Sequence, residues 1–250
     1  MAKLSEIVEF LDLELKISEI PDYSGAHNGL QLENGGEVTK VAVAVDASLD
    51  VVEQAVEEGA DLLVVHHGLF WQGVSMMTQG RYRKLKAAFD GGLAIYSSHI
   101  PLDVHPMWGN NALLAEVLGL EVSEKFQPWK GIELGLAGQW EGTWEDLERV
   151  VSEKVGPVLS STRAGDGVGK LGIITGGAGS EVEAAKAAGI DTFLTGEGPH
   201  WSFPLAQELG LSVILAGHYA TETFGVRKIG RVLGKKYDVE CVFIDCPTGL

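Results

Sequence analysis

Two kinds of hydrophobic spacing alternate along the chain. Short apolar runs typical of buried strands occur at Val41–Val45, Leu62–Val65 and Leu93–Tyr96. Apolar positions with helical spacing occur at Leu49–Glu58, Tyr82–Phe89 and Asn111–Leu118. This strand–helix rhythm predicts an α/β protein with largely parallel sheets flanked by helices.

The middle of the chain has a different pattern. Ile132–Trp140 is richer in glycine and alternates loosely, and Trp144–Val155 then has the spacing of an amphipathic helix with Thr143 as its N-cap. The change suggests a boundary near Gln127 and Pro128. We therefore expect two interlinked α/β domains, residues 1–126 and 127–250.

An internal repeat relates the two predicted domains. When the chain is shifted by 130 positions, Val41–Gly68 aligns without a gap with Leu171–Gly198. The identities include Gly59 with Gly189 and Asp61 with Asp191. Any two strand–helix–strand units look somewhat alike, but the unbroken spacing favours a true repeat.

Composition narrows the class of protein. The 250 residues carry a net charge of −16, which repels phosphate backbones and makes nucleic acid an unlikely partner. No segment has the length and apolar character of a membrane span, and the N-terminus does not resemble a secretory signal. Cys241 and Cys246 are the only cysteines, as expected for a cytoplasmic protein.

The pair His66-His67 is the strongest chemical signal. It follows the apolar run Leu62–Val65 and precedes Gly68. At a strand end, two adjacent imidazoles can splay towards two ions about 3.5–4 Å apart. A lone histidine is more often structural, but a pair at the end of a buried strand favours metal binding.

Further candidate ligands follow other predicted strands. His99-x3-Asp103 and His218-x3-Glu222 occupy corresponding places in the repeat, and polar groups at strand ends meet at one edge of an open sheet. We predict that two divalent ions (Zn, Mn or Fe) are held by His66, His67, Asp103, His218 and Glu222. Neither half of the chain is expected to hold both ions by itself.

Weaker candidates surround these ligands. His99 and Glu197 are candidate proton shuttles, although His99 could equally be a structural hydrogen-bonding group. The side chain of His200 could also reach the sheet edge where the predicted ligands meet. Gly176–Gly179 could cradle an anion, but a GGAG run alone is a weak motif.

Taken together, these motifs resemble those of the NGG-one-interacting-factor-three-like proteins, also called GTP cyclohydrolase I type 2 homologues. The resemblance covers essentially the whole chain. The matching motifs, in family order, are Asn28–Gln31, His66-His67, His99-x3-Asp103 with Gly109–Asn111, Thr195–Glu197, and Gly217–Tyr219 with Glu222. Ile100 departs from the family, which usually has Thr there.

The resemblance implies a dinuclear metal site in a toroidal homohexamer built as a trimer of dimers. In it, His67 and Asp103 would hold one ion, His66 and His218 the other, and Glu222 would bridge them. Two functions remain open. The favoured one is a metal-dependent hydrolase, GTP cyclohydrolase-like, acting on a nucleotide or related small molecule. The alternative is a non-catalytic, metal-binding oligomeric scaffold.

Overall fold

The computed structural model describes residues 1–71, 73 and 75–250, and it divides the chain into two compact units. Unit 1 contains Met1–Leu102 and Gly225–Cys246, and unit 2 contains Asp103–Phe224 and Pro247–Leu250. This division differs from the expected boundary at 126/127. The chain leaves unit 1 earlier, and it returns within helix α9 (His218–Tyr237) to add a last strand to the first sheet.

The sheet of unit 1 has the order β13-β4-β5-β6-β2. Its strands are β13 (Glu240–Phe243), β4 (Lys40–Asp46), β5 (Leu62–His67), β6 (Ala94–Ser97) and β2 (Gly29–Leu32). The first four run parallel, and β2 pairs antiparallel with β6. A separate small pair joins β1 (Ala2–Lys3) to β3 (Glu37–Val38).

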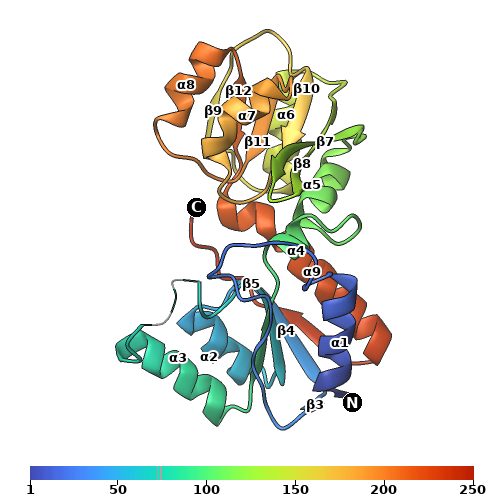
Figure 1. The fold of residues 1–250 in the computed structure, drawn as a ribbon, viewed down its shortest axis with the longest axis vertical. Helices are drawn as coiled ribbons and strands as arrows, with labels where there is room; N and C mark the ends of the chain where they lie inside the picture. Colours follow the sequence, from blue (N-terminus) through green and yellow to red (C-terminus); the bar gives the residue numbers. More distant parts are fainter. Residues whose placement is uncertain (72, 74) are drawn as a thin grey trace. The chain divides into compact units, whose positions relative to one another are not determined.

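Helices cover both faces of this sheet (Figure 1). They are α1 (Leu4–Glu14), α2 (Leu49–Glu57), α3 (Gln79–Asp90) and the later part of α9, with the short α4 (Ile100–Asp103) after β6. Val52 and Ala88 of α2 and α3 pack with Ala42, Leu63 and Ile95 on one face. On the other face, α9 passes so close to β4 that a Cβ at Gly230 would lie 3.3 Å from Val43. Burial on both faces explains the unbroken apolar runs.

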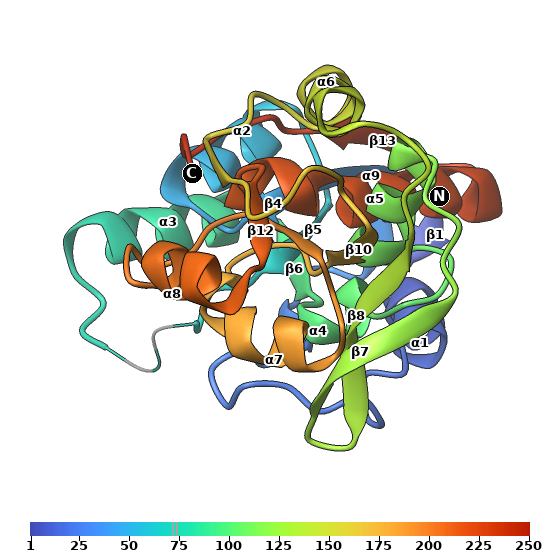
Figure 2. The ribbon, with the colours of Figure 1, turned by 90° about the horizontal axis from the view of Figure 1, so that it is seen from above.

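The sheet of unit 2 has the order β7-β8-β10-β11-β12-β9. Its strands are β7 (Glu124–Trp129), β8 (Ile132–Gln139), β10 (Lys170–Ile173), β11 (Thr192–Thr195), β12 (Ser212–Leu215) and β9 (Ser160–Thr162). Only β10, β11 and β12 run parallel. The long green hairpin β7–β8 in Figure 2 adds antiparallel pairs because its two strands are joined by a tight turn.

Two cores flank this second sheet. One face packs against α5 (Asn110–Leu118) and α6 (Trp144–Lys154), and the other against α7 (Val182–Ala187) and α8 (Ser202–Leu209), with the 3-10 turn η1 (Gly179–Glu181) before α7. Neighbouring strand residues alternate, so that Leu194 faces the first core and Phe193 the second. The predicted cap is present, since Thr143 and Asp146 form a reciprocal capping box at α6.

The repeat is visible in strand register. Val41 pairs with Leu62 in the first sheet and Leu171 with Thr192 in the second, and each strand lies 130 positions from its counterpart. The predicted mixed α/β fold with helix-flanked sheets is thus confirmed. Within residues 1–71, 73 and 75–250, no helix has the length and hydropathy needed to span a bilayer.

Candidate functional site

Strand β5 ends in the histidine pair. His66 is fully buried and His67 is partly exposed. Side chains of neighbouring strand residues normally face opposite ways, yet these two ring centroids lie 4.7 Å apart with planes at 48°. The next residue is Gly68, and a Cβ at this position would lie 2.3 Å from the side-chain amide of Gln31. The oxygen of that amide accepts a hydrogen bond from Leu69 N. The glycine therefore allows a close approach of two loops at the strand end.

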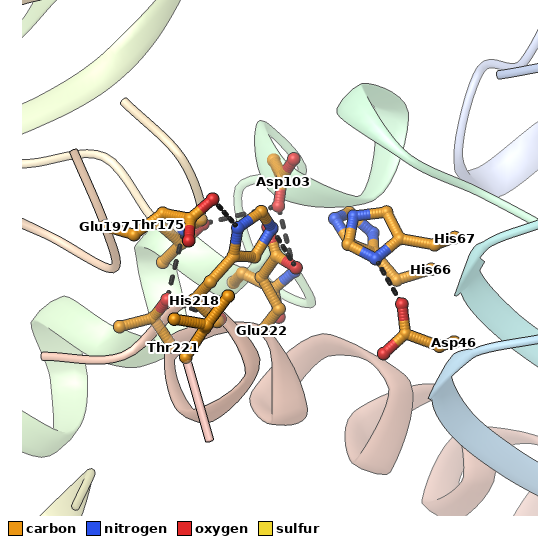
Figure 3. Close-up of polar contacts among 12 residues, drawn as sticks. Asp46, His66, His67, Asp103, Thr175, Glu197, His218, Thr221 and Glu222 are labelled. Carbon is orange, nitrogen blue, oxygen red and sulfur yellow. Dashed lines mark hydrogen bonds and ion pairs between the residues drawn. The ribbon is translucent and has the colours of Figure 1, made fainter. Parts of the chain in front are cut away.

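An oxygen acceptor orients each of three histidine rings of unit 1. The Nδ1 contacts, each 2.9 Å long, are His66 to Ser98 O, His67 to Asp46 Oδ1 and His99 to Asp22 Oδ1. The His67–Asp46 contact is drawn in Figure 3. Carbonyl and carboxylate oxygens accept hydrogen bonds, so in each neutral ring Nδ1 carries the proton and Nε2 the lone pair. This is the tautomer that a metal site needs.

His99 belongs with the histidine pair. Its ring centroid lies 4.9 Å from that of His66, and the ligand nitrogens of His66, His67 and His99 all lie within 4.8 Å of one another. Sequence reasoning considered His99 only as a proton shuttle or structural group. The structure places it in a three-histidine group that could hold a metal ion.

The loop before β2 fixes His99. Asp22 accepts from the His99 ring and from Ile100 N, and Asn28 links Asp22 to the backbone of His99. Burial by itself would raise the pKa of Asp22, but the hydrogen bond and charge of His99, with the Asn28 and Tyr23 contacts, lower it. Ile100 contributes only its backbone N–H to Asp22, so replacing the family's threonine leaves this contact in place.

In unit 2, helix α9 begins at His218, and this places Glu222 one turn further along the same face. His218 Nε2 lies 3.1 Å from Glu222 Oε2, and His218 Nδ1 lies 3.0 Å from Glu197 Oε1 (Figure 3). Burial alone would lower the pKa of His218, but the hydrogen bonds and charges of Glu222 and Glu197 raise it to about 9. The pair also offers imidazole and carboxylate atoms of the kind that bind divalent ions.

Asp103, the last residue of α4, is held by other residues of unit 2. Its Oδ1 accepts from Asn110 Nδ2 at 2.8 Å and from Thr175 Oγ1 at 3.3 Å. Asn111 is buried beside them and accepts from Thr175 N. The Gly109–Asn111 motif therefore serves to orient Asp103 and the end of β10.

The glycines of unit 2 pack loops closely instead of forming an anion cradle. A Cβ at Gly179 would lie 2.3 Å from Gly198 Cα, and one at Gly176 would lie 2.1 Å from Glu222 Oε1. The N–H groups of Gly176, Ala178 and Gly179 donate to Thr221, Thr195 and Glu197 respectively. These internal bonds occupy three of the four N–H groups of Gly176–Gly179, so the structure adds no support to the weak anion motif.

The remaining histidines lie elsewhere. His200 is exposed before α8, and no group of metal donors among the described residues includes it. His27 is exposed, as expected, and His105 accepts from Trp108 N. Neither contributes to the clusters above.

Four residues that orient the ligands were not identified from the sequence, which are Asp22, Asp46, Ser98 and Thr175, and Asn110 was included only as part of a family motif. Only Asp46 carried a usable signal, because it is a carboxylate directly after the strand run Val41–Val45. The others lie in loops or join residues far apart in sequence.

Comparison with known proteins agrees with this arrangement of motifs. A family model described as Duf34/NIF3 (NGG1p interacting factor 3) matches residues 2–249. A Pyrococcus abyssi protein named GTP cyclohydrolase 1 type 2 homolog is 41% identical over 249 residues, covering 98% of each chain. An Escherichia coli K12 protein of the same name is 35% identical over 250 residues, covering 98% of this chain and 99% of that protein.

Two solved structures show the same fold. One is described as protein ybgI of unknown function, with a TM-score of 0.91 and 33% identity, covering 99% of this chain and 100% of that one. The other is TTHA1606 from Thermus thermophilus, with a TM-score of 0.85, 35% identity and the same coverage.

Proposed function

Since the chain belongs to the Duf34/NIF3 (NGG1p interacting factor 3) family, we propose that it is a hydrolase that depends on two divalent metal ions. The observation that carries the proposal is the pair of ring nitrogens of His66 and His67 at the end of β5, which lie within 4.8 Å of each other and of a ring nitrogen of His99. The proposed ligands are His66, His67, Asp103, His218 and Glu222, as the sequence predicts.

The donor set fits such ions. Imidazole nitrogen and carboxylate oxygen suit zinc, manganese and iron, and the Nδ1 acceptors of His66 and His67 favour the tautomer that binds through Nε2. Two bound ions would supply the Lewis acidity that activates water near neutral pH. Around them, Glu197 would orient His218, and His99, held by Asp22, would accept or deliver a proton at its Nε2.

The proposed substrate is a nucleotide or a related small molecule. Relatives named GTP cyclohydrolase 1 type 2 homolog make GTP the first compound to test. The test incubates the chain, loaded in turn with zinc, manganese and iron(II), with GTP and follows products by chromatography. We expect the wild-type chain to convert GTP and the Glu222→Ala variant to leave it unchanged. Unchanged GTP in all three preparations would exclude the cyclohydrolase version.

A second candidate is a metal-binding scaffold without turnover. Helix α3 favours it, because Tyr82 and Phe89 are 54% and 64% exposed and lie seven residues apart on one face. Large exposed apolar side chains on one helix face are typical of interaction surfaces. Absence of activity on a nucleotide and phosphoester panel, together with a stable captured partner, would favour this function.

Self-association is proposed under either function. The family resemblance implies a homohexamer, and the exposed face of α3 could form contacts between copies. We also place the chain in the cytoplasm, since it has only two cysteines.

A further inference from the structure

An aromatic cluster adjoins the histidines of unit 1. The Trp71 ring centroid lies 4.5 Å from that of His99 and 5.7 Å from that of His67. Tyr23 lies 6.2 Å from Trp71 at an interplanar angle of 78°. Trp71 and Tyr23 remain 40% and 53% exposed, although Trp71 contacts His67 at the end of β5 and Tyr23 contacts His99.

The two loops that carry these rings are tied together. Gln31 donates to Ala26 O and His27 O on one loop and accepts from Leu69 N on the other. Gly25 packs so tightly that a Cβ there would lie 2.6 Å from Trp71 O. The backbone beneath Trp71 and Tyr23 is therefore held in place before any ligand arrives, which lowers the entropic cost of binding.

We infer that Trp71 offers a stacking face for a planar heteroaromatic ring, of the size of a purine base, beside the metal-donor histidines, and that Tyr23, nearly perpendicular to Trp71, contacts the edge of that ring. Exposed aromatic faces attract other planar rings by stacking, and every nucleobase presents such a face. The contacts of Trp71 with His67 and His99 place a stacked ring next to the groups that would act on it. The choice of a purine rests on the proposed function.

Guanosine is the probe, because it has a purine ring and no phosphate that could bind metal. Calorimetric titration of the full chain, with its metal content measured in the same sample, gives the affinity. Trp71→Ala should weaken guanosine binding by about 5- to 150-fold, and Tyr23→Ala should weaken it by a smaller factor because Tyr23 meets only the edge of the bound ring. Trp71→Phe should retain most of the affinity, since it keeps an aromatic face.

Trp201 provides the matched control, because it is 51% exposed and lies in unit 2. Trp201→Ala should bind guanosine as the wild type does. The inference is overturned if the wild type does not bind guanosine, or if Trp71→Phe, Trp71→Ala and Tyr23→Ala all bind it equally well. Should Trp71→Ala fail to fold, Tyr23→Ala and Trp71→Phe still decide the question.

The same samples separate this inference from the proposed hydrolase. Guanosine binding that depends on Trp71 in a chain without metal or turnover would leave the stacking site standing and remove the hydrolase. Metal-dependent turnover with a KM unaffected by Trp71→Ala and Tyr23→Ala would support the hydrolase and remove the stacking site.

Discussion

At the scale of single residues, metal binding by the histidines depends on the oxygen acceptors that contact their Nδ1 atoms. Asp46 Oδ1 lies 2.9 Å from His67 Nδ1, and Asp22 Oδ1 lies at the same distance from His99 Nδ1. Such acceptors fix the tautomer and the ring plane and make the ligand nitrogen more basic. Without them, the rings would rotate and the proton would distribute between both nitrogens.

Replacing Asp46 tests this role. Asp46→Asn keeps the size of the side chain and removes its charge, so we expect metal affinity to fall by about 10- to 100-fold. Competition with a chromophoric chelator measures the affinity. Asp50→Asn, at an exposed position on α2 of the same unit, should leave it unchanged. Equal affinities for both variants would contradict the role of Asp46.

The charge state of His218 predicts a pH dependence for the metal-free chain. Its pKa rises from 6.5 to about 9 in the folded state, so the protonated ring stabilises folding below pH 6.5, and this stabilisation is lost as the pH rises through about 9. The loss is at most about 3 kcal/mol, at 1.36 kcal/mol per pH unit. Urea denaturation in a chelator, from pH 6 to 10, measures it.

His218→Gln supplies the reference for that experiment, because its side chain does not titrate. Its free energy of unfolding should change less over the same range, and an identical pH profile in both proteins would refute the assignment to His218. Metal binding through this ring must displace its proton, so metal affinity should rise with pH up to about 9.

At the scale of elements, the loops of unit 2 are positioned by close backbone contacts. A Cβ at Gly196 would lie 2.6 Å from Gly176 O and 2.6 Å from His218 Cα. These loops follow β10, β11 and β12, the three parallel strands of the repeat. The start of α9, and with it His218, therefore depends on the absence of a side chain at Gly196.

Gly196→Ala should destabilise the fold by about 1–3 kcal/mol, because backbone atoms on both sides would have to move. It should also lower metal content by displacing His218. Gly165→Ala is the control, since a Cβ there would meet nothing within 4 Å. Chemical denaturation and elemental analysis measure the two effects. A Gly196→Ala protein as stable as the wild type would show that the loops can separate without cost.

At the scale of the whole molecule, the exposed aromatic face of α3 is the candidate contact between copies. The net charge of −16 opposes close approach of identical chains, so apolar contacts would have to supply the attraction. Tyr82 and Phe89 are the large side chains available for this on α3.

Phe89→Asp should lower the oligomeric mass from that of the proposed hexamer, because it places a charge in the contact. Arg83→Asp, at another exposed position of α3, should not. Size-exclusion chromatography with light scattering measures the mass. An unchanged assembly in Phe89→Asp, or equal dissociation of both variants, would remove α3 from the interface.

Local pattern was enough to predict the parallel strands, most helices and the repeat. A strand that is buried on both faces of its sheet requires consecutive apolar residues, and such runs are visible in the sequence. It also placed Glu222 one turn after His218, since that relation depends only on helical spacing.

Three features required the tertiary structure. They are the partners of the ligands, the return of α9 and β13 to unit 1, and the antiparallel edges of the second sheet. The hydrogen bond between His99 and Asp22 joins residues 77 positions apart, and the one between Asp103 and Thr175 joins residues 72 positions apart. Contacts of this range leave no periodic trace in a sequence, so only the folded chain could reveal which oxygen atoms hold which ligands.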